Sequence, residues 1–278
     1  MKKNLLIITK PSMSASPAFE RIYNTLKQNP EVDKIYLEHG VHRYKFDDDK
    51  CDMVISLGGD GTVLYSAWRF QKHTIPIFSI HGGTLGFLSN FSTADISSQL
   101  MRLSDMQWSE RNRLKCVLNG TETHVLNEVI IDRGQGTQMI KLNVSTGGKH
   151  LTDIHADGLI ISTPTGSTAY SLSAGGSLVH PEAPLTMLTP ICPHSLSFRP
   201  LILPHHMPLE ISVSPDSPKG VSIAFDGRNR TSLNQNDTLI IVKSDHGIKL
   251  AIKKDVSTDW ISNLKESLFW NRRSVKQV

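Results

Sequence analysis

A glycine-rich turn between a buried strand and a helix is the strongest chemical signal in this sequence. The turn reads Gly58-Gly59-Asp60-Gly61-Thr62 and follows the apolar run Met53–Leu57. Glycines let backbone N–H groups approach an anion closely, and the N-terminus of the following helix adds its positive dipole end. A carboxylate repels phosphate, so Asp60 suits such a turn only if it takes a proton from a hydroxyl or reaches a divalent cation. The alternative is a plain turn in which Asp60 only caps the helix.

Two polar residues, Asn127 and Glu128, interrupt the apolar run 125–131. Adjacent residues of a strand face opposite sides, and an unpaired buried carboxylate is costly. Glu128 therefore needs a partner, such as a ligand hydroxyl or a charged neighbour. A bulge or a strand end that exposes both residues would account for the pair equally well.

A third segment begins at Asp157 and continues through an apolar strand into Thr163-Pro164-Thr165-Gly166-Ser167-Thr168-Ala169-Tyr170. This loop offers many hydrogen-bonding groups and, in Tyr170, one aromatic face that can stack on a flat ring. A nucleotide base and its ribose require such groups. A capped loop rich in Ser and Thr, with no ligand, would look the same.

The first hundred residues contain the elements that must position the glycine turn. Strands are expected at 5–9, 35–37, 53–57 and 75–80, and helices after Ser16-Pro17, over 62–71 and over 93–101. Strands that alternate with helices predict βαβ units and a mostly parallel sheet. We therefore expect a Rossmann-like α/β domain over residues 1–112, completed by the C-terminal tail 258–278 with its helix at 260–270.

From about residue 113 the pattern changes to antiparallel β structure. Apolar runs on both sides of Gly147-Gly148 predict a tight hairpin, and the runs 239–242 and 248–252 around Asp245-His246-Gly247 predict a second. Apolar and polar residues also alternate at 209–213 and 221–225, as in a half-buried strand. We expect an all-β, sandwich-like domain over 113–257, with the active site in the cleft between the two domains.

Composition excludes several classes of protein. The chain has 278 residues and a net charge of +4 with no basic run longer than two, which argues against nucleic-acid binding driven by bulk charge. Cys51, Cys116 and Cys192 are odd in number and far apart, as expected of reduced thiols. The apolar run after Met1 is too short for a signal peptide or a membrane span, so we expect a cytoplasmic protein that does not bind membranes.

The motifs together resemble those of the NAD kinase family. They are, in order, Gly58–Thr62, Leu85-Gly86-Phe87-Leu88, Asn127-Glu128, Thr163–Tyr170, Pro190–Pro200 and Phe225-Asp226-Gly227-Arg228. The resemblance covers residues 52–228. The stretch Thr163–Tyr170 is the discriminating one, because lipid kinases and phosphofructokinases carry similar glycine–aspartate motifs.

The resemblance implies transfer of a phosphoryl group from ATP to the 2′-hydroxyl of the adenosine ribose of NAD, which forms NADP, and polyphosphate is the alternative donor. Asp60 would act as the general base. The backbone of Gly58, Gly59, Gly61 and Thr62 would hold phosphates. Mg²⁺ or another divalent cation would offset the charge of the transferred group.

The resemblance also implies where the other predicted site residues act. It places Asn127 and Glu128 at ribose hydroxyls, Phe87, Thr168, Ala169 and Tyr170 at the adenine, and Asp157 and Ser173 at the nicotinamide end. The predicted dinucleotide site further includes His155, Thr165, Ile191 and Asp226. A homodimer or homotetramer is expected, in which a neighbouring subunit contributes near Ile191.

Two other functions fit part of this pattern. One is a kinase of the same superfamily that acts on a lipid or sugar hydroxyl, which would need a pocket different from the Thr163–Tyr170 loop. The other is a dinucleotide-binding sensor without catalytic activity, which would keep the pocket but would not need Asp60.

Overall fold

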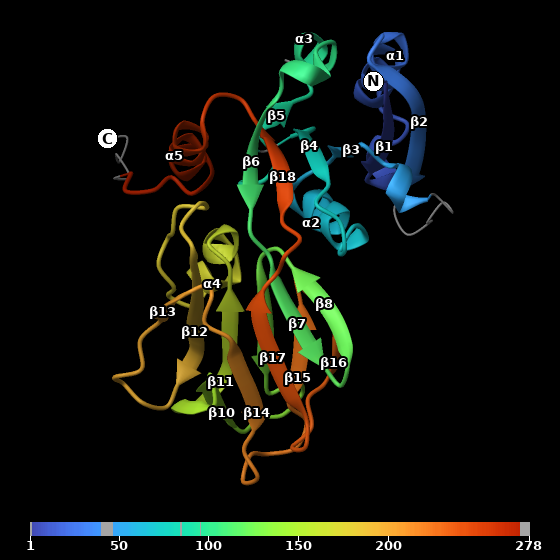
Figure 1. Ribbon diagram of the computed structural model, residues 1–278. Coiled ribbons are helices and arrows are strands. Elements are labelled where there is room, and N and C mark those ends of the chain that lie inside the picture. The colour runs from blue at the N-terminus through green and yellow to red at the C-terminus, as the bar shows by residue number, and fades with distance from the viewer. Residues whose placement is uncertain (1, 40–46, 84, 95, 273–278) are drawn as a thin grey trace. The chain divides into compact units, whose positions relative to one another are not determined.

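The computed structural model, shown in Figure 1, describes residues 2–39, 47–83, 85–94 and 96–272. The chain divides into two compact units. The first contains the residues up to 110 together with those from 248 onward, and the second contains residues 111–247. No helix in the described ranges is long and apolar enough to cross a membrane.

A seven-stranded sheet forms the centre of the first unit. Its strands are β1 (Lys3–Thr9), β2 (Val32–His39), β3 (Met53–Leu57), β4 (Pro76–His81), β5 (Phe91–Ser92), β6 (Gln107–Arg111) and β18 (Ile248–Ile252). The order is β2-β1-β3-β4-β18-β6, with β5 paired to β4, and the pairs from β2 through β18 are parallel. All five residues of β3 are buried, as in a sheet covered on both faces. The predicted parallel α/β architecture is confirmed.

Two helices of the first unit begin at a side chain that accepts one of the free N–H groups of the helix. The helices of this unit are α1 (Pro17–Gln28), α2 (Asp60–Arg69), α3 (Ile96–Leu100) and α5 (Val256–Ser267), with 3-10 turns at Pro11–Met13, Asp48–Lys50 and Leu103–Asp105. Ser16 Oγ accepts the Phe19 N–H at 3.2 Å, as the sequence predicts for the start of α1. The Asp255 carboxylate does the same for Thr258 at 2.9 Å, so α5 begins four residues before the predicted 260.

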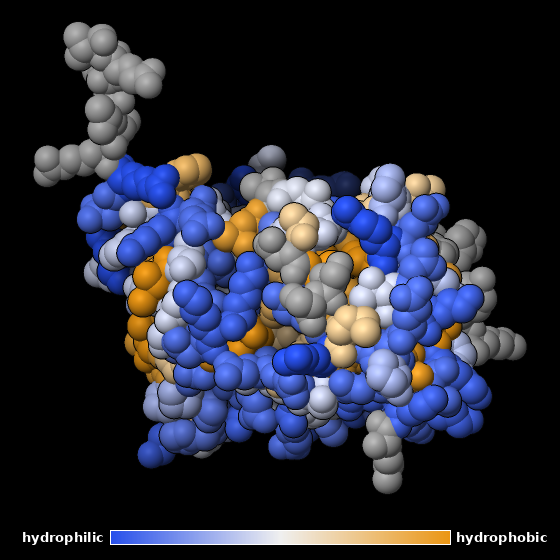
Figure 2. Space-filling view, turned by 90° about the horizontal axis from the view of Figure 1, so that it is seen from above, coloured by the Kyte–Doolittle hydropathy of each residue, from blue (hydrophilic) through white to orange (hydrophobic). Residues whose placement is uncertain are grey.

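Two expected segments extend beyond the described residues. The helix expected over 93–101 is observed only as α3, and residue 95 lies outside the described ranges. Of the tail 258–278, residues 273–278 also lie outside them. Large apolar side chains reach the surface of this unit, including Met101 and Ile261, which are 43% and 45% exposed. Figure 2 shows hydrophobic residues set among hydrophilic ones on the face that it views.

The second unit is built from one large antiparallel sheet. Its strands are β7 (Leu114–Leu118), β8 (Thr121–Val125), β9 (Glu128–Asp132), β10 (Ile140–Thr146), β11 (Lys149–Ser162), β12 (Leu185–Pro193), β13 (Leu201–Pro204), β14 (Leu209–Val213), β15 (Ser222–Phe225), β16 (Arg228–Ser232) and β17 (Thr238–Lys243). The order is β16-β15-β9-β11-β10-β14-β17-β7-β8, and β12 pairs with both β11 and β13. A 3-10 turn (Thr165–Thr168) and the short helix α4 (Tyr170–Ser173) follow β11.

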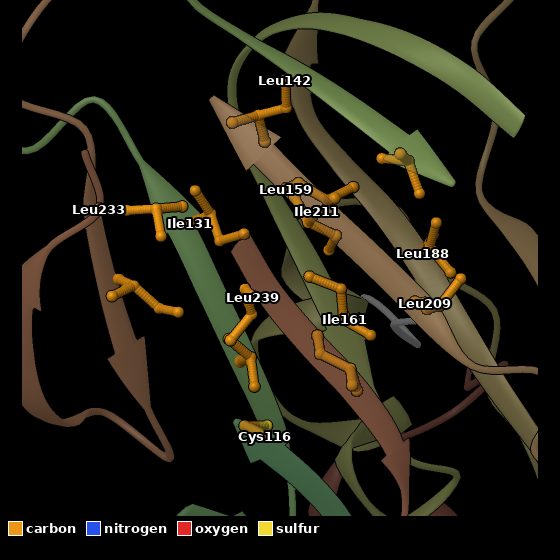
Figure 3. Close-up of a cluster of buried hydrophobic side chains, with 14 of the residues drawn as sticks. Cys116, Ile131, Leu142, Leu159, Ile161, Leu188, Leu209, Ile211, Leu233 and Leu239 are labelled. Atoms are coloured by element: carbon orange, nitrogen blue, oxygen red, sulfur yellow. The ribbon is translucent and has the colours of Figure 1, made fainter. Parts of the chain in front are cut away.

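A contact between strands that are far apart in the order shows that this sheet curls. β15 contacts β8, although seven strand spacings separate them. In a flat sheet that separation would be about 34 Å. The close-up in Figure 3 shows Leu233 and Ile131 pointing toward each other within the hydrophobic core of this unit. The second unit therefore has the sandwich-like all-β fold that the sequence predicts.

The first predicted hairpin is confirmed. Thr146 at the end of β10 pairs with Lys149 at the start of β11. The two residues between them, Gly147 and Gly148, have φ angles of 54° and 73°. A two-residue turn of this kind requires positive φ at both positions, which glycine adopts without strain.

The second predicted hairpin is wrong. β17 pairs with β14 and β7, whereas β18 pairs in parallel with β4 of the first unit. Four of the five residues of β18 are buried, as in a strand covered on both faces rather than in a half-exposed hairpin. Residue 247, rather than 257, is therefore the last residue of the second unit.

Candidate active site

The glycine turn connects β3 to α2 as the sequence predicts. The Gly58 N–H donates to the Ile80 carbonyl of the neighbouring strand at 2.8 Å. Gly59 is the last residue before the helix, and Asp60 is the first helical residue. Gly61 is exposed, whereas Thr62 is buried. The turn thus lies at the carboxyl end of a parallel strand, where open α/β sheets bind their ligands.

The Asp60 carboxylate holds a separate loop, residues 85–90, on the start of α2. Oδ2 accepts the Phe87 N–H at 2.8 Å, and Oδ1 accepts the Leu88 N–H at 3.0 Å and the Ser89 hydroxyl at 3.1 Å. The side chain does not cap its own helix, so the plain-cap alternative is wrong. A carboxylate offers about four acceptor positions. The described residues occupy three of these positions, which leaves one on Oδ2 for the proton of a bound hydroxyl.

Gly86 explains the spacing of the Leu85–Leu88 motif. A Cβ at this residue would lie 2.0 Å from Asp60 Oδ1, which is closer than any real contact. The loop can approach the carboxylate only because residue 86 has no side chain. Phe87 itself is half-buried and contributes its backbone N–H to this contact.

The opposite side of the same loop is held by β4 and by the C-terminal segment. Ser79 Oγ donates to the Leu88 carbonyl at 2.6 Å. Asn90 donates through Nδ2 to the Ala251 carbonyl of β18 at 2.8 Å, and the Ser267 hydroxyl of α5 donates to the Leu85 carbonyl at 3.1 Å. Elements from the N-terminal half and from the C-terminal segment of the chain therefore position the loop that holds Asp60.

In the second unit, the Asn127-Glu128 pair lies at the junction of β8 and β9. Asp226, in the turn between β15 and β16, accepts the backbone N–H groups of Leu126, Asn127 and Glu128 at 2.7, 2.8 and 3.0 Å. Asn127 is 9% and Glu128 6% exposed, so the alternative of a strand end that exposes both residues is wrong. The contacts make Asp226 a support for this junction, and a direct contact of Asp226 with a ligand stays a prediction.

Glu128 is the buried carboxyl group for which the sequence analysis expected a partner. Its Oε2 is buried and has no hydrogen-bond partner among the described residues. Burial and the nearby Asp226 carboxylate raise the pKa of Glu128 to about 7, against the lowering effect of the Tyr170 N–H. Burial likewise raises the pKa of Asp226 to about 6, although three N–H groups favour its charged form. A buried acceptor without a partner is suited to a ligand hydroxyl.

The Thr163–Tyr170 loop packs directly on Asn127. The Thr163 N–H donates to the Asn127 carbonyl at 2.9 Å, and the Thr163 hydroxyl donates to the Leu126 carbonyl at 2.6 Å. A Cβ at Gly166 would lie 2.2 Å from the Asn127 carbonyl oxygen, so the two segments touch backbone to backbone. Two motifs far apart in the sequence thus form one surface.

The side chains of this loop differ in exposure. Thr165 is buried, Thr168 and Ala169 are half-buried, and Tyr170 is 43% exposed at the start of α4. Ser173 is exposed at the end of α4. The aromatic face expected of Tyr170 is therefore accessible next to the junction that holds Glu128.

The remaining predicted residues lie at a second place, farther along β11. The Asp157 carboxylate is 3.1 Å from the Arg133 guanidinium, and the exposed His155 ring stacks on His194 with 5.0 Å between centroids. Ile191 lies on β12 opposite Gly158. Five residues of strand separate Asp157 from Ser162, which pairs with Glu128, so the two places are about 17 Å apart. The structure therefore divides the predicted dinucleotide residues into two groups.

Sequence reasoning missed Ser89, which donates to Asp60. It placed Thr163 in a motif but gave it no role, whereas the structure shows that Thr163 joins the loop to the Asn127 junction. Ser89 directly follows the Leu85–Leu88 motif, and that position was the available signal. In the part of the chain that is described, no three His, Cys, Asp or Glu side chains come together as metal ligands.

Family models match most of the chain. The ATP-NAD kinase N-terminal domain matches residues 4–107, and the ATP-NAD kinase C-terminal domain matches residues 126–252. Among curated proteins, the chain is 40% identical to NAD(+) kinase of Saccharomyces cerevisiae, over 80% of this chain and 46% of that protein. It is 38% identical to NAD kinase 2, chloroplastic, of Arabidopsis thaliana, over 81% of this chain and 24% of that protein. The chain spans 64% or less of the length of the first curated relatives that it matches.

Solved structures agree with the fold. A crystal structure of yeast NADH kinase complexed with NADH has a TM-score of 0.86 at 30% identity, and the match covers 98% of this chain and 89% of that one. An NAD kinase from Archaeoglobus fulgidus in complex with ATP has a TM-score of 0.79, and the match covers 95% of this chain and 99% of that one. At 22% identity, this second match shows the fold alone.

Proposed function

This chain belongs to the NAD kinase family, and on that premise we propose that it is an NAD kinase. It would transfer the terminal phosphoryl group of ATP to the 2′-hydroxyl of the adenosine ribose of NAD and release NADP and ADP. The observation that carries this proposal is the Asp60 carboxylate, fixed by three donors beside a glycine turn with one acceptor position open. A sensor would not need a carboxylate in this position.

In the proposed reaction, Asp60 Oδ2 accepts the proton of the ribose hydroxyl. The hydroxyl oxygen then forms a bond to the terminal phosphorus, and the bond from that phosphorus to the ADP oxygen breaks. The backbone N–H groups of the glycine turn and the N-terminus of α2 would offset the phosphate charge. Because Asp60 is already held in place, little reorganisation is needed when the hydroxyl arrives.

NAD would bind along the second unit. Asn127 and the unpaired Glu128 Oε2 would meet ribose hydroxyls, and the exposed Tyr170 ring would stack on the adenine. His155, Asp157 and Ile191 would meet the nicotinamide end. The distance of about 17 Å between the two groups supports an elongated ligand with a ring at each end.

A divalent cation such as Mg²⁺ would enter with ATP and neutralise charge on its phosphates. Mg²⁺ is usually held by one or two carboxylates together with substrate phosphates and water rather than by a cage of protein ligands. Asp60 at the start of α2, beside the glycine turn, is the carboxylate that this mode would use.

Three further expectations stay predictions. A homodimer or homotetramer follows from the family resemblance, as does a phosphoryl donor that is ATP or polyphosphate. A cytoplasmic location is also expected, although the Arabidopsis relative carries a chloroplastic name.

The decisive experiment compares NADP formation from NAD and Mg-ATP by the wild type and by Asp60→Asn. Loss of the general base should lower kcat by about 10²–10⁴-fold, while NAD binding measured by calorimetry persists. Asp33→Asn, an exposed carboxylate on β2, is the matched control and should leave kcat unchanged. A folded wild type that binds NAD but forms no NADP would support the sensor instead.

A further inference from the structure

An arginine outside the predicted site, Arg113, lies buried beside the Asn127-Glu128 junction of the second unit. Its side chain is large and only 1% exposed. Arg113 directly precedes β7, whose first residue, Leu114, pairs with Val125 of β8. Continued by one residue, this register sets Arg113 beside Leu126, the first of the three residues whose N–H groups donate to Asp226.

The contacts of Arg113 with its surroundings hold its side chain in place without a ligand. Its Nε donates to the His246 carbonyl, and its own carbonyl accepts the Ser244 N–H at 2.9 Å. The Ser244 hydroxyl lies 2.7 Å from His124 Nδ1, and the other nitrogen of that ring lies 2.7 Å from the Glu122 carboxylate. A buried guanidinium is costly unless an opposite charge lies near it.

The opposite charge is that of the Asp226 carboxylate. Burial lowers the pKa of Arg113 to about 10, against the raising effect of Asp226, so Arg113 stays charged at neutral pH. Burial raises the pKa of Asp226 to about 6, against the lowering effects of the three N–H groups and of Arg113. Each of the two groups therefore stabilises the charged form of the other.

The other titratable groups around this pair supply no positive charge near pH 7. Glu128 faces Asp226 and is itself an acid. Cys116 also faces Asp226, and burial raises the pKa of its thiol well above the ordinary value. His124 faces Arg113, and burial lowers the pKa of its ring. Among the described residues that act on Asp226, Arg113 is therefore the cation.

We propose that Arg113 is a positioning residue of the dinucleotide site, because its positive charge holds the Asp226 carboxylate in its charged form. In that form Oδ1 accepts the N–H groups of Asn127 and Glu128, and Oδ2 accepts that of Leu126. A protonated carboxyl group carries a donor on one oxygen and loses acceptor capacity there. The junction would then lose part of the support that orients its side chains toward the ribose. This inference rests on the proposed function, in which NAD is the ligand.

The first test measures the Kd of NAD by calorimetry at pH 7 with the full chain. Arg113→Met keeps an unbranched stem, removes the charge, and should raise the Kd by about tenfold. The KM for NAD should rise with it, while kcat and the KM for ATP stay the same, because Asp60 is untouched. Arg113→Lys keeps the charge and should restore most of the affinity. An unchanged Kd in Arg113→Met would overturn the proposal.

Two further variants separate charge from packing. Lys219→Met removes an exposed positive charge from the same unit and should leave the Kd unchanged. In an Asp226→Asn background there is no carboxylate for Arg113 to hold, so adding Arg113→Met should change the Kd much less than it does in the wild type. An equal loss of affinity in both backgrounds would show that Arg113 acts by packing alone and would overturn the proposal. Circular dichroism establishes that the variants are folded.

Hydrogen exchange gives a readout in the wild type that needs neither NAD nor a variant. After correction for the intrinsic effect of pH, the amides of Leu126, Asn127 and Glu128 should lose protection as pH falls through about 6, where Asp226 takes up a proton. In Arg113→Met this loss should begin about one pH unit higher. Full protection of the wild type at about pH 5 would overturn the role of the Asp226 charge. A failure of the proposed function would differ, because the wild type would then form no NADP whatever the exchange shows.

Discussion

At the scale of single residues, Asp60 and Glu128 are buried or half-buried carboxylates with opposite environments. Asp60 accepts three hydrogen bonds from one loop, whereas Glu128 keeps one oxygen without a partner in the described structure. Donors stabilise a charged carboxylate and fix its orientation, and burial without donors does the reverse. The first environment suits a base held in place, and the second suits a group that waits for a ligand hydroxyl.

Ser89→Ala removes one of the three donors that hold Asp60. We expect kcat to fall severalfold while the KM values for NAD and ATP stay the same, because the base is less well oriented but the substrate contacts persist. The free energy of unfolding should fall by about 0.5–1.5 kcal/mol for the lost hydrogen bond. Ser12→Ala, at an exposed position, serves as the control. An unchanged kcat would show that Ser89 does not orient the base.

Glu128→Gln should change how stability depends on pH. The pKa of Glu128 is raised in the folded state from 4.5 to about 7, so the folded wild type binds an extra proton between these values and loses stability as pH rises through that window. The Gln variant does not titrate. Its free energy of unfolding should therefore rise relative to that of the wild type from pH 5 to pH 8, by up to about 3 kcal/mol. Urea unfolding at several pH values measures this gain.

The exposed Glu20→Gln is the control for this experiment, because it removes a carboxylate from α1 without touching a buried group. Its stability should follow that of the wild type across the window. If the Glu128→Gln curve also ran parallel to the wild type, the raised pKa of Glu128 would be contradicted.

At the scale of elements, the loop 85–90 contacts both chain segments that make up the first unit. Its contacts reach α2 through Asp60, β4 through Ser79, β18 through Ala251 and α5 through Ser267. A short segment held from several sides can keep a carboxylate in place without a regular element of its own. The C-terminal helix therefore helps to hold the loop that contacts Asp60, although the helix carries none of the predicted site residues.

Gly86→Ala tests this loop as an element. The added Cβ would lie 2.0 Å from Asp60 Oδ1, so either the loop or the carboxylate must shift. We expect kcat to fall by at least tenfold while the general base is still present. A Cβ added at the nearby Gly83 would meet no atom within 4 Å, so Gly83→Ala should leave kcat nearly unchanged. Equal activity in the two variants would mean that the close contact is unimportant.

At the scale of the whole molecule, the two units have separate hydrophobic cores and separate sets of functional groups. The first contains Asp60 and the glycine turn, and the second contains most of the residues predicted to bind the dinucleotide. Neither unit alone holds all the groups that the proposed reaction needs. This division explains why the motifs are distributed over most of the chain.

The expected oligomer is tested at this scale. One chain has a mass of 30.9 kDa, and light scattering after size exclusion should give two or four times that value. A mass of one chain at micromolar concentration would contradict the expected homodimer or homotetramer, with the contribution near Ile191 from a neighbouring subunit.

The sequence by itself determined the elements whose conformation is local. The start of α1 follows from Ser16 and Pro17, and the first hairpin follows from two glycines that accept positive φ. The order of motifs was also sufficient to identify the family, because matching residue types at matching positions is a property of the chain alone. The parallel sheet followed from the alternation of strand and helix patterns.

Only the tertiary structure decided which distant groups meet. β18 pairs with β4 rather than with the neighbouring β17, Asp226 reaches a junction about a hundred residues away, and the Ser89 hydroxyl reaches Asp60. The raised pKa of Glu128 likewise depends on burial and on a neighbour from a different hairpin. Burial, pKa shifts and close contacts depend on packing between residues that are distant in the chain. Local sequence patterns therefore do not predict which side chains will come within hydrogen-bond distance.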